Sequence, residues 1–247
     1  MTLPVPDTPL EGASNFRDLG GYRTADGRRV RRGQVFRSDH LAGLTARDRR
    51  TLQALGVTHS VDFRGDSERA MLPYEWPGLT ALPFGIEPTV VARVRERLEA
   101  GRVPSTEETV DLMRETYRGF VHEHAATFGR FLRLVASQPT PLVFHCTAGK
   151  DRTGFAAALL LSALGVDAAT IEHDYLLTNR LYRRSPQVEG HAPAHVLEVL
   201  WQVQPAFLAA AHEAVERHHG GVQAYLSGPV GLTADDRRRL QDRLLVD

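Results

Sequence analysis

The sequence predicts an α/β protein in which a central, mostly parallel sheet is flanked by helices. Two observations carry this prediction. Short runs of β-branched or aromatic residues alternate with amphipathic helical segments, and no internal repeat or low-complexity linker interrupts them. The chain has 247 residues, 42% of them hydrophobic, which is enough to bury one sizeable core. We therefore expect residues 1–247 to form a single domain with a helical C-terminal part.

Four short strands are predicted from the β-branched and aromatic runs. They are expected at 35–37, 60–63, 81–84 and 142–144. A first helix is expected where Thr45 and Asp48 have the spacing of a capping box. Leu52 and Leu55 fall on one face of this helix, and Gly56 ends it.

Helices dominate the rest of the chain. A long amphipathic helix is expected at 117–136, where apolar residues recur on one side. The nearly all-apolar segment 153–164 predicts a helix that is buried on every side and ends at Gly165. Asp167 can cap the next helix, which runs to about 181. The last third is expected to be helical, with breaks at Pro205, 220–221 and 228–229 and with Thr233 and Asp236 capping the final helix.

Residues 86–116 have the character of an insertion that contains two helices. The first is expected at 88–100, and Ser105 with Glu108 forms a capping box for the second. Two interpretations stay open. The helices either pack on the core without further role, or they form a mobile helical lid over the mouth of an active site.

Charge and composition exclude several classes of partner. Thirty Lys and Arg residues balance thirty Asp and Glu residues, which predicts no nucleic-acid partner. No apolar stretch reaches the ~18 residues of a membrane span. Residues 1–11 lack the features of a signal peptide, and the single cysteine fits a reducing compartment. We therefore expect a cytoplasmic protein, although the sequence leaves export without a signal peptide open.

The segment 145–154 carries the chemistry. It reads His-Cys-Thr-Ala-Gly-Lys-Asp-Arg-Thr-Gly, follows an apolar strand and opens a helix. A tight loop between a strand and a helix N-terminus forms a cradle for anions, because loop N–H groups point inward and the helix dipole favours negative charge. The residues expected to bind phosphate or another oxyanion are Thr147, Ala148, Gly149, Lys150, Asp151 and Arg152.

Cys146 and Arg152 are the expected catalytic pair. A thiolate at Cys146 would attack phosphorus and form a phosphocysteine, which water then hydrolyses. The planar fork of Arg152 matches two phosphate oxygens and stabilises the charge on them in the transition state. Thr153 can donate a hydrogen bond to Sγ of Cys146. Gly149 permits a backbone conformation closed to other residues, and His145 orients the loop through backbone hydrogen bonds.

These ten residues resemble the phosphate loop of the protein tyrosine phosphatase superfamily. The chain is similar to the bacterial atypical tyrosine/serine phosphatases, a group with mycobacterial members. The likeness also includes 15–22, 62–64, 174–179 and 220–226, and it covers essentially the whole chain after about Glu11. It implies a tyrosine-phosphatase-like fold and a cysteine-dependent phosphatase of dual specificity.

The resemblance also implies an acid for the leaving group. Many members of the superfamily use an aspartate on a Trp-Pro-Asp loop, but residues 76–78 here are Trp-Pro-Gly, which we interpret as a turn. In the atypical bacterial group the aspartate inside the phosphate loop takes this role, and it matches Asp151. Asp62 is the alternative acid, or else a strand-end residue bonded to Arg64 or to the loop.

Lys150 matches a pattern linked to phosphoinositide as well as phosphotyrosine hydrolysis, although its side chain could simply be solvated. The implied substrates are phosphorylated proteins, on tyrosine and on serine or threonine, and phosphoinositides. Asn15, with Arg17 and Asp18, either shapes the floor near the loop or forms a structural clasp.

No metal and no organic cofactor are expected, because Arg152 and the loop amides supply the positive field. Two other functions were weighed against hydrolysis. A catalytically weak phospho-binding module would need loss of Cys146 or Arg152, and both are present. A rhodanese-type sulfurtransferase also has a cysteine after a strand, but the continuation Lys-Asp-Arg-Thr-Gly argues against it.

Overall fold

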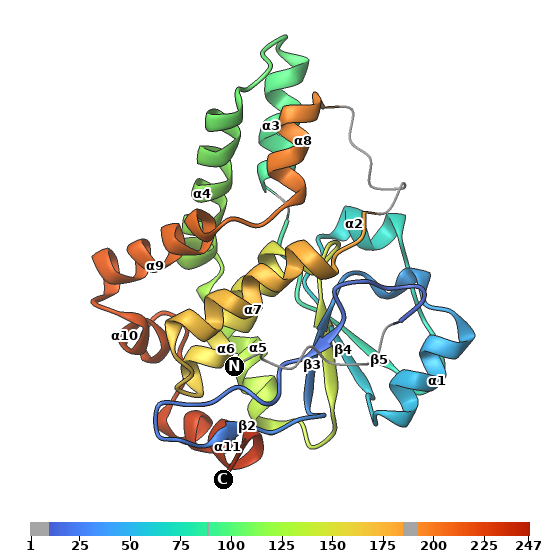
Figure 1. Ribbon diagram of the computed structural model, residues 1–247, viewed down its shortest axis with the longest axis vertical. Helices are drawn as coiled ribbons and strands as arrows, with labels where there is room; N and C mark the ends of the chain where they lie inside the picture. The colour runs from blue at the N-terminus through green and yellow to red at the C-terminus, as the bar shows by residue number, and fades with distance from the viewer. Residues whose placement is uncertain (1–9, 88, 185–191) are drawn as a thin grey trace.

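A central five-stranded sheet organises the computed structural model of the protein, which describes residues 10–87, 89–184 and 192–247 (Figure 1). Its order is β1-β3-β6-β4-β5, and only β1 runs antiparallel to its neighbour. The strands are β1 (Arg17–Asp18), β3 (Val35–Ser38), β4 (His59–Asp62), β5 (Thr80–Pro83) and β6 (Leu142–His145). The predicted α/β class with a mostly parallel sheet is confirmed. The four predicted strands end within one residue of the expected positions.

Helices surround this sheet and make up most of the rest of the chain. They are η1 (Leu41–Gly43), α1 (Ala46–Ala54), α2 (Asp66–Met71), α3 (Thr89–Glu99), α4 (Thr106–Glu123), α5 (Ala125–Ser137), α6 (Asp151–Ala163), α7 (Ala168–Leu181), α8 (Ala194–Trp201), α9 (Pro205–His219), α10 (Val222–Ser227) and α11 (Ala234–Leu244). A second sheet pairs β2 (Arg29–Val30) with β7 (Leu245–Val246). It holds the C-terminal end of α11 against the N-terminal part of the chain.

The sheet separates two hydrophobic cores, because side chains alternate between its faces. Leu142 and Phe144 of β6 lie in the larger core, whereas Val143 lies in the smaller one. The larger core takes in the helices from α3 onward. The smaller core holds α1 through Leu52, together with Trp76. Trp76 therefore packs in a core, as expected of a turn without a catalytic carboxylate.

Several helix signals in the sequence are confirmed. Thr45 and Asp48 form the predicted capping box of α1. Asp167 accepts a hydrogen bond from the N–H of Thr170 at the start of α7, and Thr233 caps α11. Helix α6 is buried along almost its whole length, as its apolar sequence predicts.

The single helix expected at 117–136 is wrong. The chain forms two helices, α4 and α5, with a non-helical residue at His124 (φ −120°, ψ 12°) between them. The hydroxyl of Tyr225 donates to the carbonyl of Val121 at 3.0 Å, so this carbonyl is satisfied without a further helical turn. A partner more than 100 positions away in the sequence thus accompanies the break, and no local pattern reveals it.

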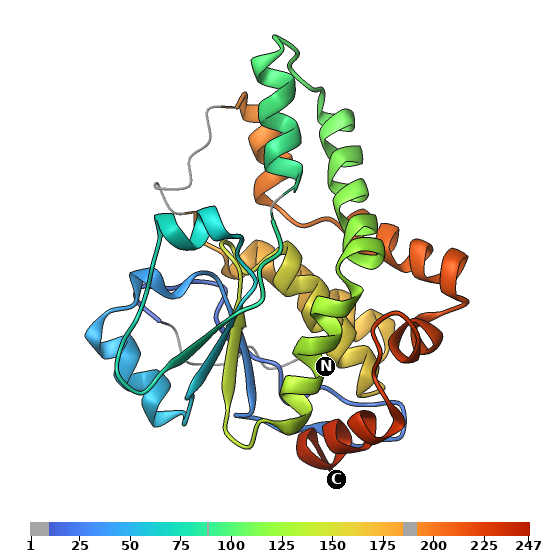
Figure 2. The ribbon, with the colours of Figure 1, turned by 180° about the vertical axis from the view of Figure 1, so that it is seen from behind.

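The expected boundary of the inserted segment is also wrong. Ser105 and Glu108 form the predicted capping box, but the helix they open continues past 116 to Glu123 as α4. The segment 86–116 is therefore not a separate unit. Helix α8 (orange) packs against α4 (Figures 1 and 2), and Nε2 of His195 contacts the carbonyl of Pro104 at 3.0 Å. Pro88, where the first inserted helix was expected to begin, lies outside the described residues, as do residues 1–9 of the N-terminal segment.

None of the helices in the described part of the chain is both long and apolar enough to cross a bilayer.

The contact between α5 and the turn before α11 generates a first prediction. A Cβ at Gly129 would lie 1.9 Å from the carbonyl oxygen of Val230, whereas a Cβ at Gly119 of α4 would meet nothing closer than a side-chain oxygen at 3.5 Å. Gly129→Ala should therefore lower the free energy of unfolding by roughly 1–3 kcal/mol, because backbone must shift. Gly119→Ala should raise it by about 0.5–1 kcal/mol, because alanine favours a helix. Urea denaturation of both variants tests this, and equal effects would contradict it.

Candidate active site

The candidate site lies where the parallel strands end. Ser38 of β3, His145 of β6 and Asp62 of β4 stand in one register across the sheet. The loop 146–150 leaves β6 at this edge and leads directly into α6. Ligands of open α/β sheets bind outside the carboxyl ends of the strands, so this edge is the expected place for a site.

The carbonyl groups of the loop are turned away from its interior. Each of residues 146–150 has its carbonyl oxygen in a hydrogen bond to the surrounding scaffold. The donors are His145 Nδ1, the N–H of His40, Asn15 Nδ2, Arg37 Nη2 and the N–H of Gly154. In contrast, none of the N–H groups of residues 147–150 donates a hydrogen bond within the described part of the chain. The loop is thus arranged as a cradle of free N–H groups, which suits an oxyanion.

Gly149 is the residue that permits this loop shape. Its φ of 63° lies in the left-handed region, and a Cβ there would lie 2.2 Å from the carbonyl oxygen of Ser38. Its own carbonyl oxygen accepts from Asn15 Nδ2 and from Arg37 Nη2, both at 2.8 Å. A larger residue would therefore break both the conformation and the contact with β3.

A buried ion cluster supports the loop from below. Asp174 of α7 binds Nε of Arg17 at 2.8 Å and Nη1 of Arg37 at 2.7 Å, and all three side chains are buried. Burial raises the pKa of Asp174, but the two guanidinium groups outweigh it and lower the pKa to about 2. Arg17 also donates to the side-chain oxygen of Asn15. Asn15 and Arg17 thus touch the loop or its supports, while Asp18 instead accepts from the N–H groups of Gly20 and Gly33 as part of a turn.

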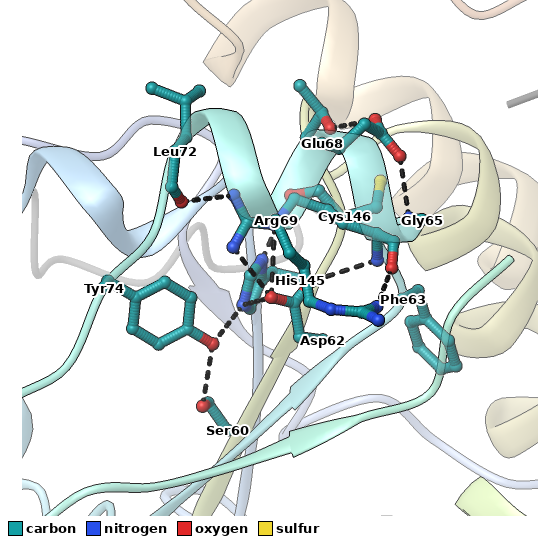
Figure 3. Close-up of polar contacts among 12 residues, drawn as sticks. Ser60, Asp62, Phe63, Gly65, Glu68, Arg69, Leu72, Tyr74, His145 and Cys146 are labelled. Atoms are coloured by element: carbon teal, nitrogen blue, oxygen red, sulfur yellow. Dashed lines mark hydrogen bonds and ion pairs between the residues drawn. The ribbon is translucent and has the colours of Figure 1, made fainter. Parts of the chain in front are cut away.

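His145 lies beneath Cys146 in a chain of hydrogen bonds. Its Nδ1 contacts the carbonyl oxygen of Cys146 at 3.1 Å, and its Nε2 lies 2.7 Å from the hydroxyl of Tyr74, which contacts Ser60 (Figure 3). Burial lowers the pKa of His145 to about 4, so the ring is neutral near pH 7. A carbonyl accepts only from a protonated nitrogen, so the proton is on Nδ1 and Nε2 accepts from Tyr74.

Asp62 is held in an ion pair with Arg64. The guanidinium meets both carboxylate oxygens of Asp62, the nearest pair at 2.8 Å, and both side chains are buried. Burial raises the pKa of Asp62, but His145 and Arg64 lower it by more. The structure thus shows the strand-end arrangement, in which Asp62 is bonded to Arg64.

Arg152 reaches from the start of α6 to α2. Its Nη1 and Nη2 bind both carboxylate oxygens of Glu68, with Nη2 at 2.8 Å, and Nη1 also donates to the carbonyl of Ile86 at 2.8 Å. Thr147 donates a further hydrogen bond to Glu68. Burial lowers the pKa of Arg152, but Glu68 and Cys146 raise it by more. All hydrogen bonds of Arg152 within the described residues use Nη1 and Nη2, which leaves Nε for a ligand.

Asp151 is held by α4. The hydroxyl of Tyr117 donates to its carboxylate at 2.9 Å, and the hydroxyl of Tyr175 lies 2.6 Å from that of Tyr117. Burial, followed by the charge of Asp151, raises the pKa of Tyr117 well above its ordinary value, so this hydroxyl stays a donor. Nζ of Lys150 lies 3.4 Å from the other carboxylate oxygen of Asp151.

These groups surround a cavity of about 420 Å³, which we call the active-site cavity. Its floor is formed by the loop, and its walls come from α2, α3, α4, α8 and Tyr182. The lining includes Cys146, Thr147, Ala148, Lys150, Asp151, Arg152, Glu68, Met71, Val90, Val91, Arg95, Met113, Thr116, Phe120, Leu197, Leu200 and Trp201. The walls are thus mainly apolar, although Ser67, Glu68, Glu87, Arg95 and Thr116 also lie on them, and the floor carries the charged groups of Lys150, Asp151 and Arg152.

One expected contact is not formed. Oγ1 of Thr153 is buried and has no hydrogen-bond partner within the described part of the chain, so it does not donate to Sγ of Cys146. Apart from Asp18, which belongs to a turn, the predicted residues lie at or directly beneath the loop. Asp62, Arg64 and His145 lie behind the floor of the cavity, whereas Cys146 and the residues after it line the cavity itself.

Sequence reasoning missed three groups that hold this site. Glu68 binds Arg152, Tyr117 binds Asp151, and Arg37 binds the loop carbonyl of Gly149. Glu68 follows the segment 62–64 by four residues and caps α2 through the N–H of Gly65, which is a readable local signal. Tyr117 and Arg37 had no local signal, because their partners are over 30 and over 100 positions away.

Comparison with known proteins gives a consistent result. The model of a tyrosine phosphatase family matches residues 8–246. A Cupriavidus necator protein named as a tyrosine-protein phosphatase is 37% identical over 89% of this chain and 82% of its own length. The triple specificity protein phosphatase PtpB of Mycobacterium tuberculosis is 30% identical over 88% of this chain and 91% of its own.

Two further matches are weaker. A tyrosine-protein phosphatase of Nostoc commune is 29% identical over 84% of this chain and 73% of its own. Among solved structures, TpbA of P. aeruginosa aligns with a TM-score of 0.32 and 22% identity, over 72% of this chain and 87% of that chain. The last likeness is too low to bear on the site.

The buried ring of His145 generates a prediction on pH. The unfolded chain binds a proton below about pH 6.5, whereas the folded pKa is about 4, so the folded state loses stability as pH falls between these values. As pH falls through this window, the free energy of unfolding of the wild type should decrease, relative to that of His145→Gln, by up to about 1.4 kcal/mol per pH unit. The glutamine variant cannot titrate at this position. Urea denaturation of both proteins at several pH values measures this difference. Parallel curves would contradict a buried neutral ring.

Proposed function

Since this chain belongs to the tyrosine phosphatase family and is therefore a phosphatase, we propose that it hydrolyses phosphate monoesters through a phosphocysteine at Cys146. One observation carries the proposal. Cys146 lies at the floor of the active-site cavity, beside a loop whose carbonyls are all turned to the scaffold and whose N–H groups at 147–150 have no acceptor among the described residues. An oxyanion bound by these N–H groups would place its phosphorus next to Sγ.

The proposed first step transfers the phosphoryl group to sulfur. The thiolate of Cys146 attacks phosphorus, the S–P bond forms, and the ester P–O bond breaks. Nε of Arg152 and the loop N–H groups stabilise the charge on the phosphoryl oxygens. Glu68 holds the opposite edge of the guanidinium at 2.8 Å, so the free edge of Arg152 is presented in a fixed orientation.

Asp151 is the proposed acid of this step and the base of the next. Its carboxyl group lines the cavity and is fixed by Tyr117 at 2.9 Å. It gives its proton to the leaving oxygen, then takes one from the water that attacks phosphorus. That attack breaks the S–P bond and releases phosphate and the thiolate. Asp62 is not proposed for this role, because its carboxylate oxygens are bonded to Arg64 behind the floor.

The proposed substrates are phosphorylated proteins. A cavity with apolar walls above a polar floor suits the ring of phosphotyrosine, because the ring can be buried while the phosphate meets the loop. The relative from M. tuberculosis is named a triple specificity phosphatase. We therefore include phosphoserine and phosphothreonine in the proposal. Phosphoinositides are included as well, because the resemblance implies them.

We also propose that the chain forms one phosphatase domain and acts in the cytoplasm. The match of the family model over residues 8–246 supports the first part. The single cysteine supports the second, because a thiolate nucleophile without a partner cysteine needs a reducing environment. A binding role without catalysis is not favoured, since both Cys146 and Arg152 are in place.

Hydrolysis of p-nitrophenyl phosphate tests the proposed function. The wild type should be active in the presence of EDTA, because no step uses a metal. Cys146→Ser should reduce the rate to that of buffer, since a hydroxyl is not ionised in this site. Binding of inorganic phosphate by the serine variant shows that its loop is intact. Activity retained in Cys146→Ser, or lost with EDTA, would contradict the thiolate mechanism.

The role of Asp151 is tested by changing the leaving group. Asp151→Asn should reduce kcat for a phosphotyrosine peptide by about 10²–10⁴-fold, because the tyrosine oxygen needs a proton as it leaves. It should reduce kcat for p-nitrophenyl phosphate much less, since nitrophenolate is a good leaving group. Asp62→Asn is the matched control at the rival carboxylate. A leaving-group effect in Asp62→Asn alone would overturn the assignment.

A further inference from the structure

We propose that Lys150 is a positioning residue that fastens helix α8 to the phosphate loop, and that it does not bind substrate phosphate. The inference rests on the proposed function, because it concerns the same loop. It departs from the expectation that Lys150 recognises phosphoinositides. It assigns to α8, which the sequence did not connect with the site, a direct link to the catalytic loop.

The contacts of Lys150 carry the inference. Its side chain is 3% exposed, although it lines the active-site cavity. Nζ donates to the carbonyl oxygen of Leu200 and, at 3.1 Å, to that of Gln202, and it lies 3.4 Å from the carboxylate of Asp151. An ammonium group has three N–H donors. Two of them are used by the carbonyl oxygens of Leu200 and Gln202, and the carboxylate of Asp151 pairs with the charge of the ammonium group. The ammonium group is thus already surrounded by protein oxygens.

The position of these oxygens gives Lys150 its effect on α8. Leu200 lies in the last turn of α8 and Gln202 directly follows the helix, where the helix dipole is negative and a cation is favourable. The adjacent residue Val203 is held by Asn179 of α7 through two hydrogen bonds of 2.8 Å. The C-terminal end of α8 is thus held at two points, one on the phosphate loop and one on α7.

Helix α8 is a wall of the active-site cavity, so its attachment matters for the site. Leu197, Leu200 and Trp201 line the cavity together with side chains of α2 and α3. Loss of the Lys150 contacts would free this wall and at the same time remove the ammonium group beside Asp151. A substrate-binding lysine would instead affect only those substrates that carry a further phosphate.

The fluorescence of Trp201 provides a readout that needs no activity. The chain has two tryptophans, so Trp76→Phe leaves Trp201 as the sole reporter of α8. In this background, Lys150→Met keeps an unbranched side chain, one atom shorter, but removes its donors, and Lys150→Arg keeps donors and charge. Asn179→Ala is the matched control, because it releases the same end of α8 without touching the loop. Thermal melts confirm that each variant folds, and Lys150→Gln replaces Lys150→Met if that variant does not.

Lys150→Met should make Trp201 more accessible to acrylamide, and Asn179→Ala should shift it in the same direction. Because two charge-assisted hydrogen bonds are lost, the population with α8 detached should rise about tenfold or more. Lys150→Arg should restore much of the wild-type quenching. Unchanged quenching in a folded Lys150→Met would overturn the proposal.

Kinetics of two substrates separate a positioning role from substrate binding. The ratio of kcat/KM for p-nitrophenyl phosphate to that for a soluble phosphatidylinositol trisphosphate should be the same in the wild type and in Lys150→Met. The pH profile of kcat should change in Lys150→Met but not in Asn179→Ala, because Lys150 contacts Asp151 and Asn179 does not. A selective loss of about tenfold for the trisphosphate would show a lost phosphate contact and overturn the proposal. Absence of activity on both substrates in the wild type would contradict the proposed function, while Trp201 would still decide the role of Lys150.

Discussion

The site depends on one constraint, which is that the carbonyl groups of residues 146–150 face the scaffold. Five consecutive carbonyls find donors there, from the ring of His145 to the guanidinium of Arg37. Because backbone polar groups must be paired or solvated, this arrangement leaves the N–H groups as the free side of the loop. The buried pair of Arg37 and Asp174 fixes the donor for Gly149, so an ion cluster under the sheet edge determines the shape of an anion site above it.

The loop also organises the walls of the cavity. Three consecutive residues each reach a different helix: Lys150 contacts the end of α8, Asp151 contacts Tyr117 of α4, and Arg152 contacts Glu68 of α2. Asp151 and Arg152, which are proposed to act on the phosphoryl group, therefore also hold walls of the cavity. Binding of a charged group by the phosphate loop would change the strength of the contacts with α8, α4 and α2, because each contact is a hydrogen bond to a charged side chain.

The sequence predicted the parts of the structure whose causes are local. Strand runs, capping boxes such as that of Thr45 and Asp48, and the strand–loop–helix around Cys146 all depend on neighbours in the chain. The break at His124, the packing of α8 on α4, and the partners of Lys150 depend on contacts between distant segments. The expected end of the inserted segment at 116 is wrong for the same reason. Helix α4 continues through this position to Glu123, and the apolar pattern alone does not reveal where packing ends the helix.

The central claim is that the phosphoryl group passes through sulfur at Cys146. It is tested most directly by rapid acid quenching of the enzyme during turnover of a phosphopeptide labelled with ³²P, followed by peptide mapping. The account predicts label on the peptide that contains Cys146, and no label in Cys146→Ser or after prior alkylation of the thiol. Turnover without any label on Cys146, or label on a carboxylate such as Asp151, would contradict it.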